Sequence, residues 1–306
     1  MNASCLRYLS RGEAEAVPSS ADGGKPRLGQ FVRVAGPCAS GEFKKLFLCR
    51  NEETGRLAAW LEAFPGKERD LREETEVLRG LSHPNLPQLL AASESVMVLP
   101  LFPRGDLVSI ITSGKASARL GLRVWADILD ALLYLRSRRI LHGDVCPWNV
   151  LVGRSGRFVL TDFGGAVVLQ AGAPLRKDRV TRVAFCPPEA VFPMKLLWDS
   201  YDTYSLALTV VAFLSGVDPF GDVPILETAY CKLEAYVLFE MDGKEVDWQA
   251  YWPIGFEKAR DALREAGVGE AAEVLAHHLA IDVKRRPSHQ STQQKIRGFF
   301  TRVKGS

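Results

Sequence analysis

Two short polar turns constrain the fold of this chain more than any other feature. The first lies within residues 141–152 (LHGDVCPWNVLV) and carries Asp144 and Asn149; the second, 161–164 (TDFG), carries Asp162. Asp162 follows Asn149 by thirteen residues, and short strand candidates surround residues 150–152 and 158–161. One such turn alone is readily explained as ordinary surface structure. Both together at this separation indicate a functional unit.

The residue types of the two turns are those that phosphoryl transfer requires. A carboxylate must orient the attacking hydroxyl and accept its proton, and Asp144 has that position. Oxygen ligands must hold the Mg²⁺ that bridges the phosphates, and Asn149 and Asp162 fit that role. The resemblance of these turns to those of protein kinases implies ATP and Mg²⁺ as cofactors.

The rest of the chain predicts an α+β protein with a strand-rich part before a helical part. From residue 28 to about 99, short apolar runs alternate with turn signals, and only 67–81 has helical spacing. Beyond Pro103 the pattern favours helices, listed here by range: 120–138, 204–214, 257–265, 271–279 and 292–303. Residues 1–27 lack periodicity and read as a mobile lead-in. We expect a ligand-binding cleft where two such lobes meet.

Composition narrows the function classes. An apolar fraction of 47% with 25% charged residues is typical of a soluble globular protein, and a net charge of +3 is too small to indicate nucleic acid or a membrane surface. The longest apolar run, 206–214, is too short to span a bilayer, and no secretory signal is visible. The six scattered cysteines resemble neither a zinc site nor a disulfide framework. These features predict a cytoplasmic protein and leave its oligomeric state open.

The two turns resemble the catalytic loop (HxDxxxxN) and the DFG turn of eukaryotic-type protein kinases. Other motifs agree: residues 185–189 (FCPPE) stand in place of the APE motif, Asp202 resembles the aspartate that opens a central buried helix, and 216–220 matches the exit from that helix. The resemblance covers residues 28–302. It implies a two-lobed fold with an N-lobe at 28–99, a hinge at 100–103 and a C-lobe at 104–302. It also implies a buried ion pair between Glu189 and Arg286.

The phosphate-binding lysine is absent from its usual strand. Kinases carry it in a V-A-I-K run, but the run here is 58–62 (AAWLE), so Leu61 takes the lysine's place. This run is similar to the V-A-W-C-E strand of the WNK (with-no-lysine) kinases, whose lysine lies on the preceding strand in G-x-G-S-F-K. Lys44 ends the matching segment here, 39–44 (ASGEFK), and Glu74 falls where the family's helix glutamate lies. We expect a Lys44–Glu74 ion pair, since strands about 5 Å apart are within reach of a lysine. The alternative is a solvated strand lysine beside Lys45.

The resemblance also assigns residues to the nucleotide. Of the usual three glycines of the phosphate loop only Gly41 remains. The adenine would use the carbonyl of Pro100 and the N–H of Phe102, and Asp106 would meet the ribose hydroxyls.

Three departures affect the acceptor side. Gly143 replaces the arginine of HRD, Cys146 replaces the catalytic-loop lysine, and Arg182 falls where a threonine usually helps to orient the nucleophile.

The leading hypothesis is an ATP-dependent kinase that phosphorylates serine or threonine of protein substrates. Two alternatives stay open: a pseudokinase scaffold that binds partners, and a small-molecule kinase, since HGD also occurs in aminoglycoside-type kinases. WNK kinases sense chloride near a DLG turn. Chloride sensing is not expected here, because Phe163 takes the place of the leucine in that turn.

Overall fold

The computed structural model describes residues 25–41, 43–169, 182–191, 200–216, 255–280 and 282–303. Contacts divide the chain into two compact units, the first Met1–Gly105 with Val152–Gly156 and the second Asp106–Leu151 with Arg157–Ser306. Most of the predicted lead-in (1–24) and most of the predicted helix exit (217–220) lie outside the described residues.

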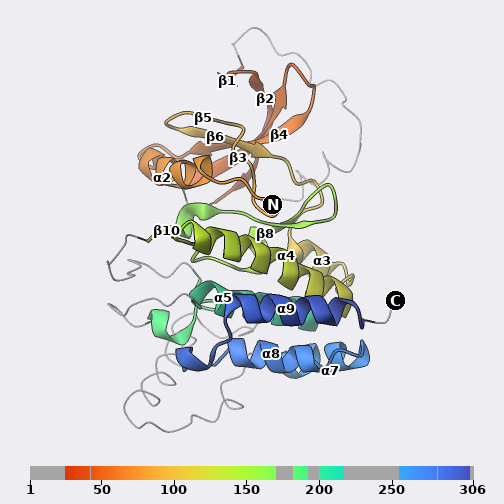
Figure 1. Ribbon diagram of the computed structural model, residues 1–306. Helices are drawn as coiled ribbons and strands as arrows, with labels where there is room; N and C mark the ends of the chain where they lie inside the picture. The colour runs from red at the N-terminus through yellow and green to blue at the C-terminus, as the bar shows by residue number, and fades with distance from the viewer. Residues whose placement is uncertain are drawn as a thin grey trace. The chain divides into compact units, whose positions relative to one another are not determined.

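The first unit is a six-stranded antiparallel sheet with one helix (Figure 1). The strand order is β1-β2-β3-β4-β6-β5. The elements are β1 (Arg27–Leu28), β2 (Phe31–Ser40), β3 (Lys44–Asn51), β4 (Leu57–Ala63), α2 (Glu68–Arg79), β5 (Ala91–Ala92) and β6 (Val96–Pro100).

Alternation along the strands gives this sheet two apolar faces. Trp60 and Cys49 pack with Phe31 on one face, while their neighbours Ala59 and Leu48 pack with Leu101 on the other. Successive side chains of a strand point to opposite faces, so an uninterrupted apolar run fills both.

The second unit is mainly helical. Its elements are α3 (Leu107–Thr112), α4 (Ala118–Ser137), β7 (Ile140–Leu141), β8 (Val150–Val152), β9 (Phe158–Leu160), β10 (Val167–Val168), α5 (Tyr201–Ser215), α7 (Phe256–Glu265), α8 (Glu270–His278) and α9 (His289–Phe300). The strands form two small ribbons, β10–β7 and β8–β9. The α+β class predicted from the sequence is confirmed, and the five predicted helices of this part all form, with ends that differ by up to three residues.

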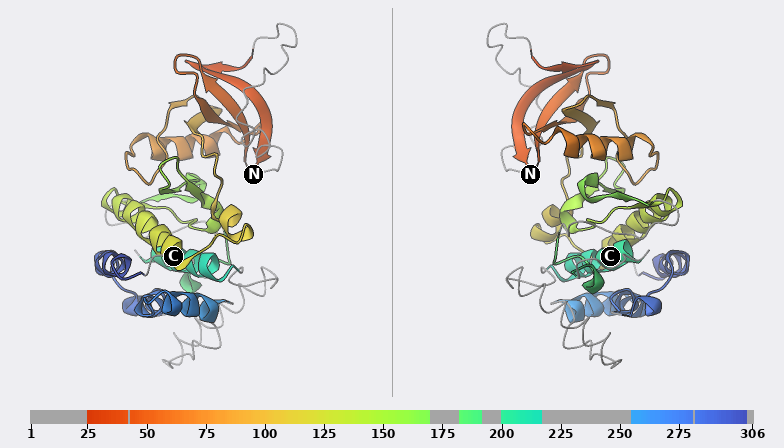
Figure 2. Two further views of the ribbon diagram at one scale, coloured as in Figure 1. Left: turned by 90° about the vertical axis from the view of Figure 1, so that its right-hand side faces the viewer. Right: turned by 90° about the vertical axis from the view of Figure 1, so that its left-hand side faces the viewer.

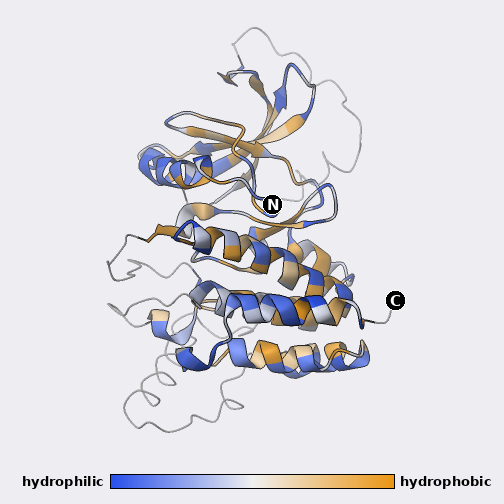
Figure 3. Cartoon of the chain, viewed as in Figure 1, coloured by the Kyte–Doolittle hydropathy of each residue, from blue (hydrophilic) through white to orange (hydrophobic). Residues whose placement is uncertain are grey.

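Helix α5 forms the centre of the second unit. Every one of its residues is buried, as its nearly continuous apolar sequence predicts. It packs against α4, α7 and α8, and two further views show this layering of helices (Figure 2). The outer α8 alternates polar and apolar segments (Figure 3), with residues such as Leu275 buried. At the α4–α5 contact a Cβ on Gly121 would lie 2.6 Å from Cδ2 of Leu214, so a larger residue there would require this leucine side chain to move.

The structure bears on two expectations from the sequence, the absence of a membrane-spanning helix and the state of the cysteines. Within the described ranges, no helix is long and apolar enough to cross a membrane. Cys49, Cys146 and Cys186 are free thiols, but Cys38 is disulfide-bonded, which the scattered cysteine spacing did not predict.

Candidate active site

The loop that carries Asp144 is held from beneath by the first turn of α5. The backbone N–H groups of His142 and Gly143 each donate to one carboxylate oxygen of Asp202, both at 2.8 Å. Asp202 is 4% exposed, and a buried carboxylate needs such donors. Gly143 has φ 73°, a conformation that glycine adopts without strain. The loss of arginine at this position therefore fits the local backbone.

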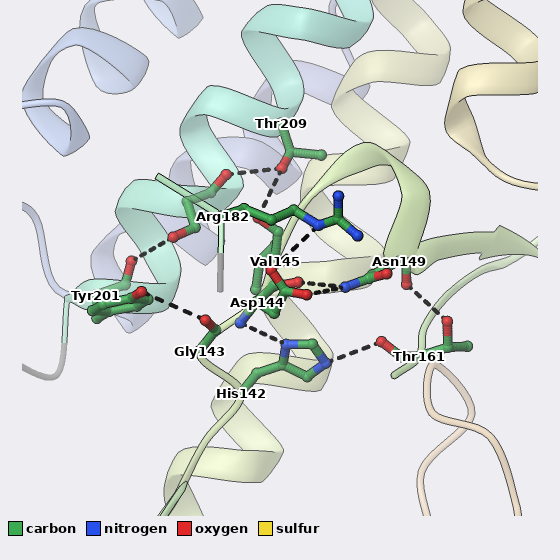
Figure 4. A network of polar contacts seen from close by, with 10 residues as sticks. His142, Gly143, Asp144, Val145, Asn149, Thr161, Arg182, Tyr201 and Thr209 are labelled. Atoms are coloured by element: carbon green, nitrogen blue, oxygen red, sulfur yellow. Dashed lines mark hydrogen bonds and ion pairs between the residues drawn. The ribbon is translucent and has the colours of Figure 1, made fainter. Parts of the chain in front are cut away.

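Asp144 itself is fixed by its neighbours (Figure 4). Its Oδ2 accepts from Nδ2 of Asn149 at 2.8 Å, and the same amide donates to the Asp144 carbonyl, also at 2.8 Å. The Asp144 N–H points to Nδ1 of His142 at 3.3 Å, and His142 Nε2 lies 3.2 Å from the Thr161 carbonyl. Nδ1 must then accept, so the imidazole proton lies on Nε2. The carboxylate is thus held in one orientation, 10% exposed.

The same contacts orient the side-chain amide of Asn149. Because both acceptors near its amide belong to Asp144, the amide nitrogen faces Asp144 and Oδ1 is turned away as an acceptor. The Asn149 carbonyl accepts from the N–H and Oγ1 of Thr161 at 2.8 and 3.1 Å, which ties the catalytic loop to the second turn.

Asp162 follows with φ 65° and ψ 83°, a left-handed conformation that costs about 1–3 kcal/mol in a non-glycine residue. Strain of this kind persists where surrounding structure enforces it, and Phe163 supplies part of that structure. Its ring is buried and lies edge-on to His142, with centroids 4.9 Å apart.

The donor chemistry of Asn149 and Asp162 fits Mg²⁺. This ion prefers hard oxygen ligands and often takes only one or two from protein, the others coming from phosphates and water. A larger cage does not occur in the described part of the chain, which contains no group of three or more His, Cys, Asp or Glu with metal-binding placement.

A cation faces the other oxygen of Asp144. Arg182 Nε lies 3.5 Å from Asp144 Oδ1. The guanidinium carbon lies 5.0 Å above the ring centroid of Trp148, which in turn meets Phe185 edge-on at 5.9 Å. Nearby Cys146 is fully buried, and this burial, with the charge of Asp144, raises the pKa of its thiol to about 12. Cys146 is therefore a neutral thiol.

In the first unit, α2 places a carboxylate within its apolar stripe. Leu71, Glu74 and Leu78 share the buried side of this helix. A buried carboxylate needs a charged or hydrogen-bonding partner, and Lys44 of β3 meets it. Lys44 Nζ lies 2.5 Å from Glu74 Oε2, with side-chain exposures of 11% and 1%. The structure thus forms the Lys44–Glu74 ion pair that the sequence predicts.

The sheet register places Lys44 close to Leu61. Leu46 is paired with Leu61 across β3 and β4, and Lys44 is two residues before Leu46. Residues two apart on a strand share a face, so Lys44 and Leu61 are diagonal neighbours on the same face of the sheet. A lysine from either position would project toward the same side.

The remaining sequence-predicted residues lie as follows. Gly41 donates its N–H to the Lys44 carbonyl at 2.8 Å, at the turn between β2 and β3. Pro100 ends β6, and the Phe102 carbonyl beyond it accepts from the N–H of Gly105 at 3.2 Å. Asp106 is the N-cap of α3, where its Oδ1 accepts from the N–H and Oγ of Ser109 at 2.9 and 2.7 Å.

Sequence reasoning missed two features of these segments. Gly36, not Gly41, is the glycine that the β2 backbone requires. It has φ 125°, and a Cβ there would lie 2.9 Å from Phe47 Cδ1 within the irregular register of β2 and β3. The contact between Arg182 and Asp144 was also missed, because 38 positions separate them in sequence. The signal that could have found it is the family position of Arg182, where a threonine usually helps to orient the nucleophile.

The predicted Glu189–Arg286 pair is confirmed. Arg286 Nη1 and Nη2 donate to the two oxygens of Glu189 at 2.6 and 2.8 Å, and both side chains are fully buried. Arg286 Nε also donates to the Ala280 carbonyl at 2.7 Å, and its guanidinium carbon lies 4.9 Å from the ring centroid of Tyr204.

Comparison with known proteins agrees with this geometry. The protein kinase domain family matches residues 36–296. Aurora kinase A-A of Xenopus laevis is 27% identical over 264 residues, 83% of this chain but 61% of that protein. The serine/threonine-protein kinase Aurora-1 of Arabidopsis thaliana is 28% identical over 284 residues, 88% of this chain and 91% of that protein. The chain belongs to the protein kinase family.

Proposed function

We propose that this chain is an ATP-dependent kinase that transfers the γ-phosphate to serine or threonine of protein substrates. The observation that carries the proposal is the fixed orientation of Asp144 by Asn149 and the His142–Thr161 contact. Orientation and electrostatics, more than covalent chemistry, produce phosphoryl transfer. The relatives named as serine/threonine kinases support the acceptor class.

On the acceptor side, Asp144 accepts a hydrogen bond from the substrate hydroxyl and takes its proton as the bond to phosphorus forms. Asn149 keeps the carboxylate rotamer fixed. Asn149, through Oδ1, and Asp162, through its carboxylate, would hold Mg²⁺. When bound with ATP, Mg²⁺ supplies positive charge that offsets the charge of the phosphates.

On the nucleotide side, Lys44 neutralises phosphate charge and Glu74 holds its ammonium. Gly41 offers backbone close to the phosphates. Pro100 and Phe102 take the adenine edge, and Asp106 uses the carboxylate oxygen opposite its capping oxygen for the ribose. These assignments follow the family pattern at matching positions.

The direct test is phosphate transfer from ATP to a generic basic protein, measured for wild type and for Asp144→Asn. We expect the substitution to reduce turnover by about 10²- to 10⁴-fold, because it removes the general base while keeping the side-chain shape. Asp261→Asn, at an exposed site on α7, is the matched control and should leave turnover unchanged. Equal background rates for wild type and Asp144→Asn would exclude the enzyme.

A nucleotide-binding pseudokinase is the second candidate. It is favoured by one observation, the position of Arg182 over the oxygen that an acceptor hydroxyl would approach. ATP binding without transfer to any tested protein would support it. Transfer to a small-molecule acceptor but to no protein would instead support the small-molecule kinase alternative.

A further inference from the structure

The catalytic loop lacks the positive charge that phosphoryl transfer ordinarily draws on. Residues 141–149 contain no lysine or arginine. Cys146, at the position of the family's lysine, is fully buried and carries no cationic group. The loop therefore presents the carboxylate of Asp144 with no compensating cation of its own.

Arg182 brings a cation to this carboxylate from a distant part of the chain. Its Nε lies 3.5 Å from Asp144 Oδ1 but forms no hydrogen bond there. Figure 4 shows its two terminal nitrogens directed away from the carboxylate. The side chain is 40% exposed, so those N–H donors are accessible to a ligand.

The surroundings hold Arg182 in this position. Its guanidinium lies over the face of Trp148, a residue that is 41% exposed, and Phe185 meets the same ring edge-on. A half-exposed ion pair at 3.5 Å contributes at most about 1 kcal/mol to stability. Stability therefore gives little reason to place an arginine and an exposed tryptophan beside the catalytic carboxylate.

We propose that Arg182 binds the phosphoryl group in transit and supplies there the charge that Cys146 does not supply. The inference rests on the proposed function. As the hydroxyl held by Asp144 attacks, its proton passes to the carboxylate, the new O–P bond forms, and the bond to the β-phosphate oxygen breaks with the electron pair leaving on ADP. Reacting atoms must approach to about 3–3.5 Å, so a phosphoryl group that meets this hydroxyl comes within reach of a guanidinium beside the same carboxylate. Arginine suits this role because its planar fork matches phosphate oxygens.

The test compares ATP and ADP binding, both with Mg²⁺, in wild type, Arg182→Gln and Arg182→Lys. Loss of a charged hydrogen bond to the γ-phosphate should weaken ATP binding by about 10-fold or more while ADP binding stays within twofold. The Arg182→Lys variant should recover part of this difference, because it keeps the charge and loses the fork. Turnover should fall in the same order. Arg264→Gln, at an exposed arginine of the same unit, is the control and should change neither quantity.

Three results would overturn the proposal. A parallel loss of ATP and ADP affinity, together with a lower melting temperature, would make Arg182 structural only. Higher turnover in Arg182→Gln would mean that Arg182 inhibits the enzyme by blocking Asp144. An unchanged ratio of ATP to ADP affinity would mean that Arg182 does not contact the γ-phosphate. The binding readout also separates this proposal from the proposed function: absent turnover in wild type removes the kinase, whereas the ATP to ADP ratio still decides the contact of Arg182.

Discussion

Glu74 in the first unit and Asp144 in the second are carboxylates that each meet a cation, and the two contacts differ in kind. Lys44 and Glu74 are 2.5 Å apart with side-chain exposures of 11% and 1%. Arg182 and Asp144 are 3.5 Å apart with exposures of 40% and 10%. The first contact is short and nearly excluded from solvent, so each side chain holds the other in place. The second is longer and more exposed to solvent, so the N–H groups of the arginine remain accessible to a ligand.

A third pair marks the fully buried end of this scale. Glu189 and Arg286 have no exposed side-chain surface and share two hydrogen bonds. Side-chain exposure rises from Glu189–Arg286 through Lys44–Glu74 to Arg182–Asp144. A side chain with no exposed surface offers no donor to a ligand, so the pairs differ in what they leave accessible.

The largest expected effect tests the buried end of the scale. Glu189→Gln removes one charge and leaves Arg286 buried without its counter-ion, which should lower the free energy of unfolding by about 3–5 kcal/mol. Urea unfolding of wild type and variant measures this. Glu257→Gln, an exposed glutamate of α7, is the control and should cost less than about 1 kcal/mol. If Glu189→Gln lowered the free energy of unfolding as little as Glu257→Gln, the Glu189–Arg286 pair would contribute no more than an exposed ion pair.

The next effect concerns the nearly buried pair. If Lys44 neutralises phosphate charge, Lys44→Met should reduce kcat/KM by about 100-fold, the equivalent of about 2.7 kcal/mol. The neighbouring Lys45→Met removes an exposed lysine of the same strand and should have little effect.

The shared sheet face sharpens this prediction. Because Lys44 and Leu61 are diagonal neighbours on one face, the double variant Lys44→Met with Leu61→Lys should recover at least part of the lost activity. Loss of activity in Lys44→Met with no recovery in the double variant would contradict the idea that the two positions are exchangeable.

A buried histidine gives a smaller, pH-dependent effect. His278 is 1% exposed, and burial, followed by electrostatic interactions with nearby His289 and Arg286, lowers its pKa from 6.5 to about 3. Above pH 6.5 the histidine is neutral in both the folded and unfolded states. Between pH 6.5 and pH 3 only the unfolded state takes up the proton, so stability falls as the pH falls.

This histidine should cost about 2 kcal/mol of unfolding free energy between pH 7 and pH 5. Urea unfolding at both pH values, with wild type and His278→Phe, measures the difference. The variant loses the contact to Thr292 Oγ1 and so has lower stability at pH 7, but its loss between the two pH values should be smaller by the stated amount. Equal losses in both proteins would mean that the histidine is protonated in the fold.

The smallest effect lies at the exposed end of the scale. Arg182→Gln should change the free energy of unfolding by less than about 1 kcal/mol, since half-exposed pairs are weak and screened by salt. A loss of 3 kcal/mol or more, measured by the same urea titration, would place Arg182 with the structural pairs and remove the contrast with Glu189.

Much of the site could be predicted from the sequence where the chemistry is local. Asp144 and Asn149 are five residues apart on one loop, and the hydrogen bond between them follows from that spacing. The positions of Glu74, Glu189 and Arg286 follow from family motifs. The contact of Arg182 with Asp144 and the demand for glycine at Gly36 could not be predicted, because each depends on a residue brought close by folding.

The sequence by itself determined the family, the α+β order of elements and the set of polar residues proposed for phosphoryl transfer, because strand and helix periodicity and short motif spacings are local properties. The tertiary structure alone decided how exposed each ion pair is and which cation faces Asp144. Burial and long-range contacts arise only when distant segments pack together. The difference between a sealed structural pair such as Glu189–Arg286 and an accessible one such as Arg182–Asp144 is therefore a property of the fold.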